Sequence, residues 1–165
     1  MRIPMTLLAT TLLATAMVAV LADDPPKPPT TIVQVYLDGK AGTPHETIPT
    51  DQVFGEVSSV PKFKYDYSGG RKDLGKVSTT IVNIFKVEGD KNTPLYAIMS
   101  PTGGAIAAGT EVDWGKLPEG FKAMHFATGK QTDGIEALPA GTYLATFVIA
   151  AADGSGTVRL HFTVK

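Results

Sequence analysis

Apolar and polar residues alternate most regularly in two runs near the C-terminus, residues 142–151 and 157–164. Because successive side chains of a β-strand point to opposite faces, a period of two predicts two strands that each bury one face. The intervening residues 152–156 read Ala-Asp-Gly-Ser-Gly, and such residues tolerate the positive φ of a tight turn. The two runs are therefore predicted to form a β-hairpin. Its predicted core positions are Tyr143, Ala145, Phe147, Ile149, Val158, Leu160, Phe162 and Val164.

The rest of the chain is divided into short apolar runs by glycine and proline. All 17 glycines and 11 of the 12 prolines follow residue 22, and no later window has the i, i+3, i+4, i+7 apolar spacing of a helix. This pattern predicts an all-β fold, an antiparallel β-sandwich of about seven to nine strands, with a jelly roll or another β-sandwich as the alternative. The five further predicted strands are residues 31–37, 60–67, 77–87, 94–99 and 121–127.

One short motif precedes the predicted hairpin. Leu138, Gly141 and Tyr143 form a Leu-x-x-Gly-x-Tyr sequence that resembles the tyrosine corner of immunoglobulin-like and fibronectin type III-like sandwiches. The resemblance covers the last two predicted strands and implies that the tyrosine hydroxyl bonds back to the preceding backbone. The chain departs from the family pattern because it has no cysteine pair and no tryptophan in the presumed third strand. In that strand, the core is expected to be filled by Ile81, Ile84 and Phe85.

The N-terminal residues have the layout of a secretory signal peptide. Arg2 supplies a positive charge, and the 18 residues from Met5 to Ala22 contain no charged side chain. We expect cleavage before Asp23, with an uncleaved membrane anchor as the alternative, because 18 residues is the lower limit for a membrane span. Residues 23–30 contain four prolines and no large apolar side chain, which predicts an extended, disordered tether. Residues 31–165 are then a single domain.

Charge and cysteine content narrow the range of functions that this chain can have. The chain has 15 Lys and Arg against 16 Asp and Glu, and without Arg2 of the leader the balance is 14 − 16 = −2. A nearly neutral chain has no general attraction for nucleic acid, and we expect membrane contact only if the leader is retained. The absence of cysteine excludes disulfides, thiolate metal sites and cysteine nucleophiles. Export without disulfides is more typical of bacteria, so we expect a secreted or periplasmic bacterial protein.

Residues that could perform catalysis or bind a metal are few and scattered. The three histidines, His45, His125 and His161, lie at no metal-ligand spacing, and each is expected at the surface. Of the methionines after the leader, Met99 and Met124, the second adjoins His125, and adjacent strand residues point to opposite faces. No serine lies in a Gly-x-Ser-x-Gly elbow. We therefore expect no catalytic residue, no metal, no cofactor and no enzymatic activity.

Aromatic side chains are the better candidates for binding. Residues 61–76 are basic and interleaved with aromatics, as in a nucleic-acid platform, but period-two alternation explains this pattern without one. Tyr36, Tyr67 and Trp114 are the candidates for a surface that stacks on a sugar or on a partner chain. Trp114 lies in a turn-rich stretch, where the role of a partly buried loop anchor is favoured over that of a ligand platform.

The sequence therefore predicts a secreted, non-enzymatic binding or assembly module of the bacterial envelope or extracellular space, with an unidentified protein or glycan as partner. A structural subunit is one alternative, in which the tether and residues 31–37 donate a strand to a neighbouring copy by edge pairing. A carbohydrate-binding module is the other.

Overall fold

The computed structural model describes residues 33–45, 50–67, 78–79, 81–151 and 154–165. These residues form fourteen strands and no helix, and hence no helix long and apolar enough to cross a membrane. Eight of the fourteen strands have four residues or more, which agrees with the predicted number of about seven to nine strands. The predicted leader, residues 1–22, and tether, residues 23–30, lie outside the described ranges.

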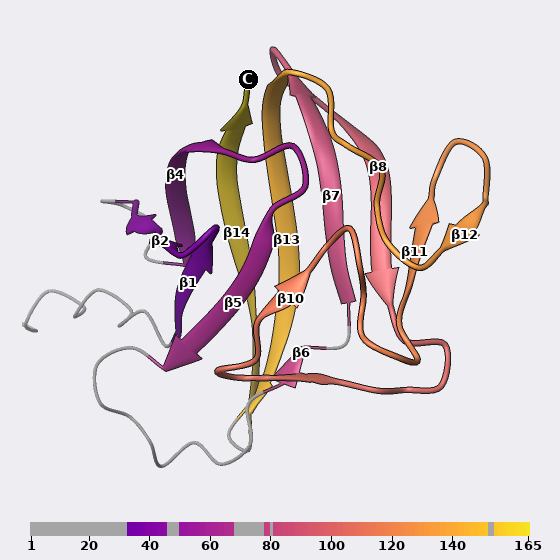
Figure 1. The fold of residues 1–165 in the computed structure, drawn as a ribbon. Coiled ribbons are helices and arrows are strands. Elements are labelled where there is room, and N and C mark those ends of the chain that lie inside the picture. The colour runs from indigo at the N-terminus through magenta and orange to yellow at the C-terminus, as the bar shows by residue number, and fades with distance from the viewer. Residues whose placement is uncertain (1–32, 46–49, 68–77, 80, 152–153) are drawn as a thin grey trace, which may run out of the picture.

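The strands form two sheets that lie face to face, so the predicted β-sandwich is confirmed (Figure 1). The small sheet has the order β10-β5-β1-β2. Its strands are β10 Val112–Asp113, β5 Lys62–Tyr67, β1 Val33–Leu37 and β2 Lys40–Ala41. Strands β1 and β5 pair antiparallel, with Val33 opposite Tyr67 and Leu37 opposite Phe63.

The large sheet contains ten strands, eight of them in the order β12-β11-β8-β7-β13-β14-β4-β3. Short strand β6 pairs with β13, and β9 pairs with β6. The strands of the main path are β12 Gln131–Thr132, β11 Lys122–His125, β8 Lys91–Met99, β7 Ile81–Glu88, β13 Gly141–Ala151, β14 Gly154–Val164, β4 Asp51–Val57 and β3 Thr43–Pro44. The two off-path strands are β6 Ser78–Thr79 and β9 Ile106–Ala107.

The predicted C-terminal hairpin is confirmed and extends further than its alternation indicated. Strands β13 and β14 pair from Gly141 opposite Val164 to Ala151 opposite Gly154, so the connection is two residues long. All eight of its predicted core side chains are buried. The turn residues 152–153 themselves lie outside the described part of the chain.

The core lies between the sheets and is rich in aromatic rings. Phe63 of β5 contacts the edge of Phe147 of β13, with ring centroids 5.2 Å apart, and Tyr143 stacks on Phe162 at 5.5 Å. Phe63 and Tyr65 are fully buried, whereas Lys62 is exposed and Lys64 half-buried. The predicted alternation is thus confirmed over residues 61–66.

The expected filling of the core by β7 is wrong in part. Ile84 is fully buried, but Ile81 and Phe85 are only half-buried, and the inward neighbour of Ile84 is Val82. Residues 81 and 84 have opposite parity, so a regular strand cannot point both to one face. Phe85 therefore faces away from the core.

Strand β4 was not predicted, because a buried glutamine interrupts its apolar pattern. Gln52 of β4 is fully buried, and its side-chain amide lies along the edge of β1 in the other sheet. Its Oε1 accepts a hydrogen bond from the Val35 N–H at 3.0 Å, and its Nε2 donates to the Val33 carbonyl at 3.0 Å. The carboxamide thus replaces a neighbouring strand at this edge and joins the two sheets.

The motif at Leu138 and Tyr143 occupies the entry to β13. Leu138 and Tyr143 are both buried, and the Tyr143 hydroxyl donates a 2.6 Å hydrogen bond to the carbonyl of Pro139, four residues earlier. Gly141 has a φ of 156°, which a side chain would strain. Burial raises the pKa of Tyr143 above its ordinary value although Lys86 acts in the opposite direction, so the hydroxyl remains a donor at neutral pH.

We predict that Gln52→Ala lowers the free energy of unfolding by about 2–4 kcal/mol, because it leaves the Val33 carbonyl and the Val35 N–H without partners in the interior. Val53→Thr on the same strand changes an exposed side chain and is expected to change stability by no more than about 0.5 kcal/mol. Urea denaturation measures both variants. Equal stability of the two would contradict the role assigned to Gln52.

We also predict that Tyr143→Phe lowers stability by about 1–2 kcal/mol, because it removes one buried hydrogen bond and keeps the ring. The matched control is Tyr36→Phe, whose ring is half-buried on the outer surface of the small sheet. Thermal and urea unfolding of both variants provide the comparison. A loss no larger for Tyr143→Phe than for the control would show that this bond does not stabilise the corner.

Candidate functional site

Trp114 does not form a stacking surface, and that prediction is corrected here. Its side chain is fully buried between the sheets, stacked on Phe63 at 6.0 Å and against the edge of Phe162 at 6.2 Å. Its carbonyl accepts a 2.7 Å hydrogen bond from the Ile135 N–H. A Cβ on Gly134 would lie 2.1 Å from the Gly115 carbonyl oxygen, so the two loops touch backbone to backbone. Trp114 therefore anchors its loop to the core, and a ligand cannot reach it.

Tyr36 lies on the outer surface of the small sheet, away from Trp114. Its ring is half-buried, and the ammonium of Lys64 lies 5.1 Å from the ring centre, where it covers one face. Tyr36 lines a hollow of about 180 Å³ together with Lys62, Lys64 and Glu111. Tyr67 is the last residue of β5, and its side chain lies outside the described part of the structure. The structure thus does not bring Tyr36 and Trp114 into one surface.

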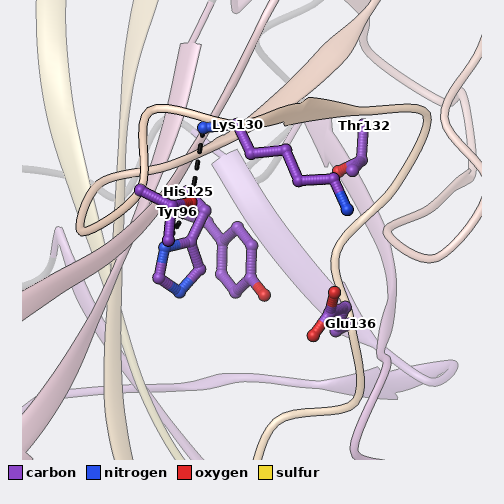
Figure 2. A pocket seen from close by; sticks show the side chains of 6 residues that line it. Tyr96, His125, Lys130, Thr132 and Glu136 are labelled. Atoms are coloured by element: carbon purple, nitrogen blue, oxygen red, sulfur yellow. Dashed lines mark hydrogen bonds between the residues drawn. The ribbon is translucent and has the colours of Figure 1, made fainter.

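A second polar pocket lies where β8, β11 and β12 extend past the small sheet (Figures 1 and 2). Its volume is about 150 Å³. The lining side chains are Tyr96, His125, Thr128, Lys130, Thr132 and Glu136. We call this site the Tyr96 pocket.

Strand pairing positions the aromatic wall of the Tyr96 pocket. Tyr96 of β8 lies directly opposite His125 of β11, and their rings meet edge to face at 5.0 Å and 86°. The following turn folds back, since the Gly129 N–H donates to the His125 carbonyl at 2.8 Å. Thr128 Oγ1 accepts a 3.3 Å hydrogen bond from the Lys130 N–H and lies 3.4 Å from His125 Nδ1. The turn therefore fixes the imidazole and the start of the Lys130 side chain.

Two opposite charges face the hollow of the Tyr96 pocket. Figure 2 shows the Lys130 side chain running toward Thr132, and the Tyr96 hydroxyl pointing toward Glu136. Within the described residues, neither Lys130 nor Glu136 forms an ion pair. Burial raises the pKa of Tyr96 above its ordinary value. A hydrogen bond with the Glu136 backbone lowers this pKa and the charge of Glu136 raises it, so the net shift is upward. The hydroxyl is therefore a donor at neutral pH.

The chemistry of the Tyr96 pocket suits binding through several hydrogen bonds. Hydroxyls donate and accept, the ammonium of Lys130 donates, and the carboxylate of Glu136 accepts. A volume of about 150 Å³ is below the usual size of a pocket that encloses a whole drug-sized ligand, so the site has room for one group of a larger molecule. Among the described residues, no three His, Asp or Glu side chains gather in a way that could hold a metal ion.

Sequence reasoning missed the Tyr96 pocket, although it identified the strands on both sides of it. Residues 94–99 and 121–127 were predicted as strands, but their pairing with each other was not. The alternation did predict that Met124 and His125 point to opposite faces, and the register confirms it, with Met124 opposite Ala97 and His125 opposite Tyr96. The sequence feature that could have indicated the pocket is a polar or aromatic residue at an inward-facing position of each of these two strands.

Comparison with known proteins identifies no relative. No protein-family model, no curated protein sequence and no solved structure matches this chain.

We predict that the emission of Trp114, the only tryptophan, lies at the short wavelengths of an apolar environment and resists quenching by acrylamide until the protein unfolds. Trp114→Ala is expected to cost about 3–5 kcal/mol of stability, as for other large buried side chains. Emission spectra across a denaturant titration measure the first effect. Strong quenching of the native protein would show that the ring is accessible after all.

Proposed function

We propose that this chain is an exported, non-enzymatic β-sandwich module that binds one sugar residue of a larger glycan in the Tyr96 pocket. The observation that carries the proposal is that the Lys130 ammonium and the Glu136 carboxylate, neither of which forms an ion pair within the described residues, face one small hollow together with a tyrosine hydroxyl. Sugar hydroxyls each donate and accept hydrogen bonds, and they match a lining that offers both. A protein partner that inserts one polar side chain is the other occupant of the right size.

Binding without turnover fits the groups that line the Tyr96 pocket. Thr128 Oγ1 accepts the Lys130 N–H within the turn and lies 3.4 Å from His125 Nδ1, longer than the about 2.6–3.2 Å of a nucleophile and its base. A nucleophile activated by a base needs a free hydroxyl within hydrogen-bond reach of that base. We therefore assign His125 and Thr128 to the shape of the pocket and not to a reaction.

We further propose that the sandwich is immunoglobulin-like. In such folds, the first, second, fourth and fifth strands share one sheet, and the third, sixth and seventh share the other. Here β1, β5 and β10 share the small sheet, and β7, β13 and β14 share the large one, which supports the proposal, whereas β4 and β8 also belong to the large sheet. The Tyr143 hydrogen bond to Pro139 also supports it. The β11–β12 hairpin, placed between β10 and β13 in the chain, is then an addition that forms the Tyr96 pocket.

The proposed location is outside the cytoplasm of a bacterium, in the periplasm or beyond the cell. It is supported by the signal-peptide layout of residues 1–22 and by the absence of cysteine in a chain of 165 residues. Fold alone does not fix function, so the binding role depends on the site and not on the immunoglobulin-like resemblance.

Strand donation by residues 31–37 is less well supported than binding. Val33, Val35 and Leu37 are fully buried in the chain's own core, and β1 already pairs with β5 on one side. On the other side, Gln52 occupies the backbone groups that a second chain would need. Donation would require β1 to leave both partners.

The test is a glycan array followed by calorimetry of the best ligand. We expect Lys130→Ala and Glu136→Gln each to weaken binding by about tenfold or more, since each removes a charge-assisted hydrogen bond. Lys116→Ala removes an exposed lysine from another loop and is the matched control, with unchanged affinity expected. If both pocket variants retain full glycan binding, the glycan binds outside the Tyr96 pocket. If the folded protein binds no glycan, the sugar assignment is wrong.

A further inference from the structure

The hollow beside Tyr36 on the outer surface of the small sheet is lined by two lysines. Its volume is about 180 Å³, and its lining residues are Tyr36, Gly39, Lys62, Lys64 and Glu111. Tyr36 belongs to β1, the two lysines belong to β5, and Glu111 directly precedes β10. The Tyr96 pocket is built on the large sheet, so the two sites are separate. We call this second site the basic hollow.

Strand pairing places the two ammonium groups and the ring of the basic hollow on one face. Lys62 and Lys64 lie two residues apart on β5, and both point outward, because Phe63 and Tyr65 are fully buried in the core. Lys64 lies directly opposite Tyr36 on β1, and its ammonium is 5.1 Å from the ring centre. Both positive charges therefore flank a single aromatic side chain.

The turn between β1 and β2 is a fixed wall of the basic hollow. Its two residues, Asp38 and Gly39, have φ angles of 51° and 74°, as in the tight turns that suit a twisted hairpin. The Asp38 carboxylate accepts the N–H groups of Ser58 at 2.7 Å and of Lys62 at 2.9 Å. Burial acts to raise the pKa of Asp38, but these hydrogen bonds outweigh it and lower the pKa. The carboxylate is thus charged and engaged with backbone, and it does not line the hollow.

The lining of the basic hollow has an excess of positive charge. Two of its five residues are lysines, and one is a glutamate. The Lys62 ammonium lies 3.9 Å from the Glu111 carboxylate, and the two side chains are 56% and 57% exposed. An ion pair that is so exposed contributes little free energy, so an incoming anion can replace it. Ammonium groups bind carboxylate, sulfate and phosphate oxygens through charge-assisted hydrogen bonds.

The size and charge of the basic hollow narrow the class of anion that it fits. A volume of about 180 Å³ is several times the ~30 Å³ that one water molecule occupies, so the hollow has room for more than a bare anionic group. Anionic membranes are bound by clusters of about four to eight basic residues, which exceeds the two present here. The chain has 15 basic and 16 acidic residues, so it has no general attraction for nucleic acid.

We propose that the basic hollow binds the carboxylate or sulfate group of an acidic sugar residue. The two lysines hold the anionic group, and the Tyr36 ring forms the wall against which the sugar packs. The affinity for an anion depends on the lysines alone, whereas the choice of a sugar as its carrier rests on the proposed function. A glycan with charged and neutral residues could then be bound at two places on the same domain.

The test compares binding of the full protein to polygalacturonate, dextran sulfate and uncharged dextran, with polyglutamate and inorganic sulfate as the other anions. We expect binding to at least one acidic polysaccharide, weaker at about 200 mM salt than at about 50 mM. Lys62→Ala and Lys64→Ala are each expected to weaken it by about tenfold. Glu111→Gln removes the competing carboxylate and is expected to tighten it by about twofold. Lys91→Ala removes an exposed lysine of the large sheet and is the matched control, with unchanged affinity.

The substituted side chains are exposed or half-buried, and circular dichroism verifies that each variant is folded. Opposite effects of Lys62→Ala and Glu111→Gln, with no effect of Lys91→Ala, support the proposal. An equal loss in Lys91→Ala overturns it, because binding would then follow total charge. Polyglutamate or inorganic sulfate that binds as tightly as the acidic polysaccharides overturns the choice of a sugar.

The Tyr96 pocket and the basic hollow can fail separately. Binding of an acidic polysaccharide that Lys130→Ala retains and Lys62→Ala loses supports the basic hollow, even if the Tyr96 pocket binds no neutral glycan. Binding of neutral glycans without any binding of acidic polysaccharides overturns the basic hollow and leaves the function proposed for the Tyr96 pocket intact.

Discussion

Ring-to-ring packing between the two sheets holds this sandwich together. The chain has no cysteine, so no covalent link joins the layers. Phe63 of the small sheet meets Phe147 of the large one, and Trp114 meets Phe162, so aromatic side chains from distant parts of the sequence share one cluster. Such side chains bury large apolar areas and add specific edge and stacking contacts. The burial of Trp114, which removes it as a ligand platform, is a direct consequence of this requirement.

The unequal size of the two sheets determines where the Tyr96 pocket lies. The small sheet covers the part of the large one around β13 and β14, and β8, β11 and β12 lie beyond its edge (Figure 1). The inward-pointing Ile98 of β8 and Ala123 of β11 are still buried in the core. Tyr96, also buried, lies beside the half-buried His125, and these two residues and the β11–β12 turn border the hollow. The pocket is therefore a product of sheet geometry as much as of its own side chains.

Strands whose apolar and polar residues alternate locally were predictable from the sequence. Features that depend on pairing between distant segments were not. The hairpin of β13 and β14 was predictable because eight apolar positions follow one parity. Strand β4 was missed because a polar residue, Gln52, occupies an inward position, and its amide partners Val33 and Val35 lie almost twenty residues away. Phe85 was assigned to the core because an apolar residue on a strand does not reveal which face it takes. The Tyr96 pocket needed the pairing of β8 with β11, which no local pattern gives.

Alternation along β8 and β11 also determines which residues line the Tyr96 pocket. Tyr96 and Ala97 are adjacent in sequence, yet one lines the pocket and the other lies on the opposite face of the large sheet, and His125 and Met124 divide in the same way. A slip of one residue in the pairing would exchange all four and remove the aromatic wall of the pocket. The register is held by the full β7–β8 ladder and by Pro94 and the irregularity beside it. The proposed ligand site therefore depends on the pairing of these strands as much as on the identity of its side chains.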